Sequence, residues 1–188
     1  MMQWESINEL NAFRLIECIP AVTQYAEQPC EITYLGADGQ EARHYPDLLV
    51  TINGAKELWE VKACADAHSD EVRRRTEILM DGLPHLGFQY RIKLAENLAI
   101  QPRLDNACLL LKFGRQPITQ VERWQFERLL EERPSLIWGE ACAGTYGLRG
   151  REVLCRLVLD GIMSIEMYQP ITDMTEFLAA REAHKWDI

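Results

Sequence analysis

The sequence lacks the segments that would place it in or across a membrane. No stretch approaches the ~20 consecutive apolar residues of a membrane span, and the start, MMQWESINEL, lacks the basic and apolar regions of a signal peptide. We therefore expect a cytoplasmic protein with no membrane partner. The six cysteines form no Cys-x-x-Cys pair and no Cys/His grouping of zinc spacing, so we expect reduced thiols without a disulfide or a structural zinc.

A surplus of basic residues is also missing. The 188 residues carry a net charge of −9, which excludes a protein held on nucleic acid by bulk electrostatics alone. The surplus of acid is uneven, because residues 1–100 hold 16 acidic against 9 basic side chains. Carboxylates are the ligands of divalent cations, so part of this surplus is available to a metal site. A partner protein could supply the remaining affinity for DNA.

The first hundred residues predict an α/β unit. Ser6-x-x-Glu9 has the form of a capping box and precedes a predicted helix at about 7–18. Turns at Asp38-Gly39 and Asn53-Gly54 predict a meander of three strands, followed by a further helix with Ser69 as N-cap and a fourth strand. The three strands of the meander are expected at 31–36, 42–52 and 56–63, the helix at 69–80 and the fourth strand at 88–95.

The rest of the chain predicts a second, mainly helical region. Thr119 and Glu122 repeat the capping-box pattern ahead of a helix at 119–132. Two short helices, within 135–144 and 148–161, and an exposed strand at 162–170 are expected next. Three helices followed by a strand is the order of a winged helix-turn-helix. We therefore predict two domains, at 1–115 and 116–188, the second small and winged-helix-like.

The hairpin around Asn53-Gly54 brings polar residues to one face. With a two-residue loop, Leu49 faces Leu58 and Asp47 faces Glu60, and Lys62 projects from the same face as Glu60. Two carboxylates on adjacent strands suit a Mg²⁺ ion, and a nearby lysine could orient a water or offset charge on a phosphate. The same pattern also describes a solvated strand face with a weak ion pair, so the residues alone leave both interpretations open.

The surrounding motifs resemble a known family. Pro46-Asp47 with Glu60-Val61-Lys62 resembles the PD-(D/E)xK nuclease signature. The stretches ESINELNAFRLIE and EQPCEITYLGADGQEARHYPDLLV are similar to the N-terminal domain of TnsA-like transposon endonucleases, including the Ser-x-x-Glu helix, Gln28-Pro29 and the Tyr-Pro-Asp strand. The resemblance covers roughly residues 5–95. It implies a restriction-endonuclease-like mixed sheet flanked by helices, and a winged-helix-like C-terminal domain.

The resemblance also implies roles for four residues. It makes Asp47 and Glu60 ligands of Mg²⁺ (or Mn²⁺), Glu9 a third carboxylate of the site, and Lys62 the catalytic lysine. Glu9 is equally explained as the capping-box residue, and the two roles are compatible. By resemblance, the activity is cleavage of the non-transferred DNA strand at transposon ends, with a DDE-type transposase and an ATPase regulator as partners.

Other residues and other functions stay open. His44 beside Pro46-Asp47, and Arg149, Arg151 and Arg156 near the last predicted helix, are candidates for DNA contacts. The three adjacent arginines at 73–75 point in three directions on a helix and are better explained as solvated surface. The alternatives to a transposase subunit are a stand-alone restriction or defence nuclease and a catalytically inert DNA-binding or assembly module.

Overall fold

A computed structural model describes residues 7–36 and 38–180. Its contacts divide the described residues into two compact units, the first holding residues 7–13 and 21–99 and the second residues 14–20 and 100–180. The fold is mixed α/β, with a four-stranded mixed sheet in the first unit and a small three-stranded antiparallel sheet in the second. The domain boundary expected after residue 115 stays a prediction.

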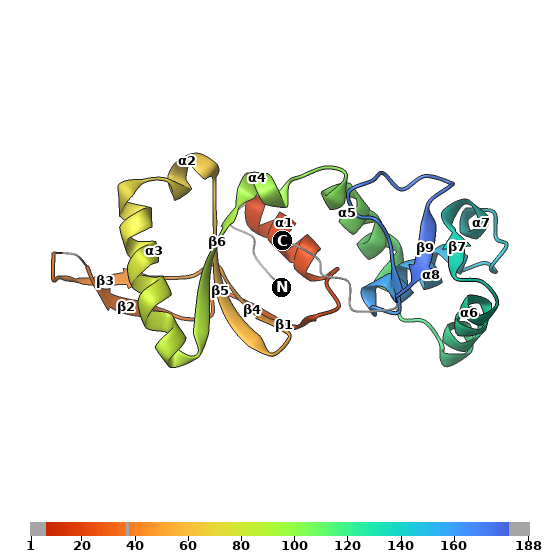
Figure 1. The fold of residues 1–188 in the computed structure, drawn as a ribbon, viewed down its shortest axis with the longest axis horizontal. Coiled ribbons are helices and arrows are strands. Elements are labelled where there is room, and N and C mark those ends of the chain that lie inside the picture. Colours follow the sequence, from red (N-terminus) through yellow and green to blue (C-terminus); the bar gives the residue numbers. More distant parts are fainter. Residues whose placement is uncertain (1–6, 37, 181–188) are drawn as a thin grey trace. The chain divides into compact units, whose positions relative to one another are not determined.

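The central sheet of the first unit has the order β1-β4-β5-β6 (Figure 1). β1, β4 and β5 run antiparallel to their neighbours, whereas β6 pairs parallel with β5. The parallel pairing is possible because a helical crossover separates these two strands in the chain. The bounds of the strands are Val22–Glu27 for β1, Leu48–Ile52 for β4, Ala55–Lys62 for β5 and Phe88–Leu94 for β6.

The turn between β4 and β5 is the two-residue loop expected from the sequence. Asn53 and Gly54 have φ values of 50° and 81°, and positive φ at both positions gives a turn whose twist matches that of the strands. Leu49 pairs with Leu58, which confirms the predicted register. The ladder ends at Leu48, so Asp47 lies in the bend just before β4 and not in a paired strand.

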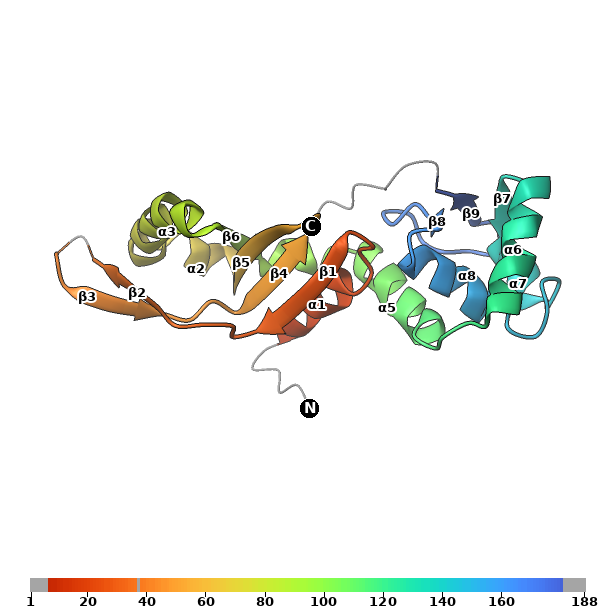
Figure 2. The ribbon, with the colours of Figure 1, turned by 90° about the horizontal axis from the view of Figure 1, so that it is seen from below.

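The predicted three-strand meander is wrong as a single sheet, although both of its hairpins form. The segment expected as one strand at 42–52 is broken at Tyr45-Pro46, where proline offers no N–H to a ladder. Its first part, β3 (Glu41–His44), pairs with β2 (Ile32–Leu35) in a separate hairpin, which Figure 2 shows projecting beyond the main sheet. Its second part, β4, pairs with β1, a strand that was not predicted.

Helix α3 (Asp70–Gly82) confirms the predicted helix at 69–80. The Ser69 hydroxyl accepts a hydrogen bond from the Val72 amide at 3.4 Å, which satisfies an unpaired N–H at the helix start. Leu79 packs with Leu58, Leu83 and Tyr90 in a buried cluster, so α3 is held against β5 and β6. This position matters because α3 brings a side chain to the site described below.

The remaining helical segments of the first unit are short. α1 (Ile7–Ile16) begins as predicted but ends two residues earlier than expected, and its last three residues belong to the second unit. Ser6, the predicted cap of α1, lies outside the described residues. The others are α2 (Cys64–Ala67), the 3₁₀ helix η1 (Leu83–Leu86) and α4 (Ala95–Leu98).

The second unit contains four helices among its described residues. α6 (Gln120–Glu132) carries the predicted capping box, with the Thr119 and Glu122 side chains each accepting from the other's backbone. α5 (Arg103–Gly114) was not predicted. It packs closely on α8 (Gly150–Leu159), because a Cβ at Gly114 would lie only 2.9 Å from the Arg156 amide nitrogen. α7 (Trp138–Cys142) lies between α6 and α8 in sequence.

The small sheet of the second unit corrects the expected exposed strand at 162–170. Only Met163–Ser164 (β8) is extended there, and Met163, Ile165 and Met167 are buried. β8 and β7 (Ser135–Ile137) pair on either side of β9 (Glu176–Ala179), in the order β7-β9-β8.

All six cysteines are free thiols, two of them buried. Over residues 7–36 and 38–180, every helix is too short or too polar to cross a membrane.

Candidate active site

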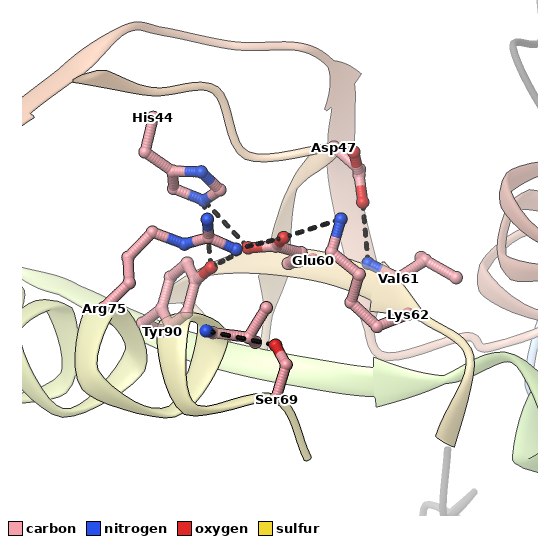
Figure 3. A network of polar contacts seen from close by, with 9 residues as sticks. His44, Asp47, Glu60, Val61, Lys62, Ser69, Arg75 and Tyr90 are labelled. Atoms are coloured by element: carbon pink, nitrogen blue, oxygen red, sulfur yellow. Dashed lines mark hydrogen bonds and ion pairs between the residues drawn. The ribbon is translucent and has the colours of Figure 1, made fainter. Parts of the chain in front are cut away.

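Glu60 lies at the centre of a buried polar network in the first unit. It is on β5 and only 2 % exposed. Its Oε1 accepts from Arg75 Nη2 at 2.7 Å and from Lys62 Nζ at 2.9 Å. Its Oε2 accepts from the Tyr90 hydroxyl and lies 3.0 Å from His44 Nε2 (Figure 3). An ionised carboxylate offers about four acceptor positions, so these four donors saturate it.

The four donors come from four different elements. Tyr90 is on β6, Arg75 on α3 and Lys62 at the end of β5, and His44 ends β3. Tyr90 and His44 also contact each other, with 2.9 Å between the hydroxyl oxygen and Nε2. Burial alone raises the pKa of Glu60, but the hydrogen bonds from His44, Tyr90 and Lys62 outweigh it and lower that pKa to about 2. Glu60 is therefore ionised in the folded protein at neutral pH.

The pKa of Asp47 is shifted in the opposite direction to that of Glu60. Burial raises its pKa, and the nearby carboxylates of Glu60 and Glu9 raise it further. The Val61 amide, which donates to Asp47 Oδ2 at 2.7 Å, and the charge of Lys62 oppose these effects without cancelling them. Asp47 is thus a partly buried carboxyl on which two carboxylates and one lysine act, and a bound cation would relieve both the burial of its charge and the repulsion.

The structure brings the four residues of the predicted site into one region of the first unit. Glu9, in the first turn of α1, is near enough to Asp47 to raise its pKa, and Glu60 and Lys62 act on the same carboxyl. Figure 3 shows the Lys62 amine between the side chains of Glu60 and Asp47. Their assignment as catalytic residues and metal ligands stays a prediction.

The donor set suits a hard divalent cation, although no site is fully formed. Within the described ranges, no three His, Cys, Asp or Glu side chains are arranged closely enough to hold a metal ion. Carboxylate oxygens are the ligands that Mg²⁺ and Mn²⁺ take in proteins, and the partly buried Asp47 carboxyl fits such an ion. Glu60 fits less directly, because its acceptor positions are already used by side-chain donors.

Two residues of the network were missed at the level of sequence. The interpretation of arginines 73–75 as solvated surface holds for Arg73 and Arg74, which are exposed, but is wrong for Arg75, whose side chain is 15 % exposed. Arg75 is three residues after Val72 and four before Leu79, so helical spacing already places it on the buried face. Tyr90 had no such signal, because its position depends on the parallel pairing of β5 with β6.

The four candidates for DNA contacts all have partners within the protein. His44 is buried and contacts Glu60 and Tyr90. In the second unit, Arg149 donates to Glu122 and to the Pro117 carbonyl, Arg156 donates to Asp160, and the Arg151 guanidinium lies 4.9 Å from the centre of the Phe113 ring. Contact of these residues with DNA stays a prediction.

Comparison with known proteins relates this region to a family. Comparison with curated proteins finds no match. Residues 19–101 match the family model described as the TnsA-like endonuclease N-terminal domain. The match includes Asp47, Glu60 and Lys62, together with the buried donors His44, Arg75 and Tyr90, and ends before most of the second unit. Residues 19–101, less than half of the chain, are therefore similar to the N-terminal domain of TnsA-like endonucleases, which is a nuclease family.

Proposed function

We propose that the protein is a Mg²⁺- or Mn²⁺-dependent DNA endonuclease that hydrolyses phosphodiester bonds. The observation that carries this proposal is the partly buried Asp47 carboxyl, whose pKa burial and two neighbouring carboxylates raise, beside the Glu60–Lys62 pair in the region that matches a nuclease family. Asp47, Glu60 and Glu9 are the proposed metal ligands. Domains at 1–115 and 116–188, the first restriction-endonuclease-like and the second winged-helix-like, are part of the same proposal.

The side chains divide the chemical work. When bound, the metal ion polarises the phosphate and lowers the pKa of a bound water. Asp47 is held in place by the Val61 amide, and Glu60 by its buried donors, so both carboxylates are oriented before the metal arrives. Lys62 is the most exposed of the residues that contact Glu60, with 33 % of its side chain exposed, so its amine can reach a substrate phosphate or an attacking water.

We further propose that the enzyme cuts the non-transferred strand at transposon ends, together with a DDE-type transposase and an ATPase regulator. The family assignment and the net charge of −9 support this role, because a partner that delivers DNA compensates for weak attraction to the phosphate backbone. His44, Arg149, Arg151 and Arg156 are kept as candidate DNA contacts, which would require them to leave their present partners.

A second function is favoured by one observation. The acceptor positions of Glu60 are filled by Arg75, Lys62, Tyr90 and His44, which is the arrangement expected if the domain is an inert DNA-binding or assembly module. The raised pKa of Asp47 argues against this alternative, because a purely structural cluster has no reason to keep a partly buried carboxyl among like charges.

Calorimetric titration of Mn²⁺ and Mg²⁺ into the wild type and Asp47→Ala tests the proposal. We expect metal binding to the wild type and at least a tenfold weaker affinity in the variant, because a carboxylate ligand is lost. Asp81→Ala, which removes an exposed carboxylate on α3, is the matched control and should bind like the wild type.

A nicking assay on supercoiled plasmid then separates the contexts. Metal-dependent nicking by the protein alone supports a stand-alone restriction or defence nuclease, and nicking only after addition of transposase partners supports the transposition role. Failure of the wild type to bind metal at millimolar concentration, with no nicking under either condition, would favour the inert module.

A further inference from the structure

Arg75 has a place in the site that neither the sequence motif nor the family match assigns. Its Nη2 donates to Glu60 Oε1 at 2.7 Å, the same oxygen that accepts from Lys62. The side chain is 15 % exposed, and its Nε is buried without a hydrogen-bond partner among the described residues. A buried N–H without a partner on a largely buried guanidinium is costly, and the contact with Glu60 offsets part of that cost.

The backbone that carries Arg75 is firmly held. α3 is fixed at its start by the Ser69 cap and on its inner face by the buried side chains of Val72 and Leu79. Lys62, the other cation on Glu60 Oε1, has a flexible side chain with twice the exposed fraction. Of the two cations, Arg75 is therefore the permanent partner of Glu60, and Lys62 is the one able to move.

The charges around Glu60 and Asp47 act in opposite directions. Two cations, Lys62 and Arg75, contact Glu60 Oε1, whereas the carboxylates of Glu60 and Glu9 both act on Asp47. The positive charge of Arg75 neutralises Glu60 directly while the site is without metal. The same charge repels any further cation that approaches Glu60, since like charges a few ångströms apart interact strongly in a poorly solvated site.

We propose that Arg75 is a positioning residue that fixes the Glu60 carboxylate as its internal counter-ion and thereby lowers the affinity of the site for a divalent cation. This inference rests on the proposed metal-dependent function. It assigns to Arg75 an effect opposite in sign to that of the carboxylates, because removal of its charge strengthens metal binding whereas removal of a carboxylate weakens it.

The test is calorimetric titration of MnCl₂ into the full chain carrying Arg75→Met or Arg75→Gln. We expect both variants to bind Mn²⁺ about tenfold more tightly than the wild type, because one positive charge near the ligands is gone. Arg75→Gln keeps a hydrogen-bond donor toward Glu60, so the result does not depend on the folding of Arg75→Met alone. Arg75→Lys keeps the charge and should return the affinity to within about twofold of the wild type.

Matched controls distinguish this effect from a general loss of structure. Arg74→Met removes the adjacent, exposed arginine of the same helix and should leave Mn²⁺ affinity unchanged. Without metal, Arg75→Met should melt at a lower temperature than the wild type, and saturating Mn²⁺ should raise its melting temperature more than that of the wild type. A merely structural role would lower stability without this larger gain from metal.

The outcomes separate the two proposals. If the wild type binds Mn²⁺ and both charge-removing variants bind it equally or more weakly, the role of Arg75 is overturned while the metal-dependent function stands. If the wild type and both variants bind no Mn²⁺, both proposals fail. If only the charge-removing variants bind, the role of Arg75 is supported and the wild-type protein is not metal-dependent as isolated.

Discussion

Glu60 in the first unit and Asp160 in the second each contact two cationic side chains. Asp160 follows α8 and accepts from Arg156 and from Arg123 of α6, so it ties two helices together. Its pKa would be raised by burial alone, but the two arginines lower it. The cluster holds two positive charges and one negative charge. Its contacts are fully explained as ion pairs that hold the two helices together.

The region around Glu60 differs because carboxylates act on one another there. Glu60 itself is more than satisfied, but Asp47 beside it has a raised pKa, owing to burial and to the other carboxylates. A stable fold does not require such repulsion, so the like charges around this partly buried carboxyl support the proposed metal site. The lesson is that the balance of a whole cluster distinguishes a site from an ion pair, whereas the number of contacts to one carboxylate does not.

Removal of the central carboxylate of each cluster should give the largest difference in the free energy of unfolding. Glu60→Ala leaves the largely buried guanidinium of Arg75 without its carboxylate partner, so we expect the free energy of unfolding to fall by about 4 kcal/mol. Asp160→Ala leaves arginines whose side chains are 27 % and 34 % exposed and can be solvated, so we expect a loss of about 1 kcal/mol. Urea denaturation in EDTA measures both. Equal losses in the two variants would break the comparison.

Lowering the pH should remove the contribution of Glu60 to the free energy of unfolding, within a defined pH range. Its folded-state pKa of about 2 lies below the ordinary value of 4.5, so its stabilisation is fully present above about pH 4.5 and is lost as the pH falls toward 2. We expect this loss to reach about 3 kcal/mol. Urea denaturation as a function of pH should therefore show a shallower acid decline in Glu60→Gln than in the wild type. If the stability of the two proteins declines in parallel as the pH falls, protonation of Glu60 does not contribute to the loss of stability in acid.

The smallest change in stability is expected when Asp47 or Asp160 is replaced by asparagine, and the two changes should have opposite signs. Because the folded-state pKa of Asp47 is raised, the stability linked to it is present below the ordinary pKa and is lost as the pH rises, so its ionised form is unfavourable at pH 7. Asp47→Asn, which keeps an acceptor for the Val61 amide, should stabilise the metal-free protein by about 0.5 kcal/mol.

Asp160→Asn is the matched variant and should destabilise the protein, because the pKa of Asp160 is lowered and its ionised form is the favourable one. Thermal unfolding at pH 7 in EDTA compares the two asparagine variants. If both variants move the melting temperature in the same direction, the repulsion at Asp47 has no energetic consequence.

Much of the site could be predicted from local sequence, but its arrangement could not. The Asn53-Gly54 turn predicted the register of β4 and β5, which ends one residue after Asp47, and the Ser69 cap with its apolar spacing located α3. The strand expected at 42–52 was wrong because Pro46 interrupts it, and the partner of β4 is β1, which lies some twenty residues earlier in the chain. Such pairing between distant strands is set by packing and carries a weak local signal.

By itself, the sequence determined the chemistry that is available: the three carboxylates and the lysine, the turn that aligns two of them, and the family-like motifs around them. These depend on residue type and on short-range geometry, which are encoded within a few positions. Only the tertiary structure decided that Arg75, Tyr90 and His44 surround Glu60 and that Asp47 is partly buried near other carboxylates. The reason is physical, because burial and Coulomb interactions depend on which side chains meet in space, and these come from α3, β6 and β3, far apart in the chain.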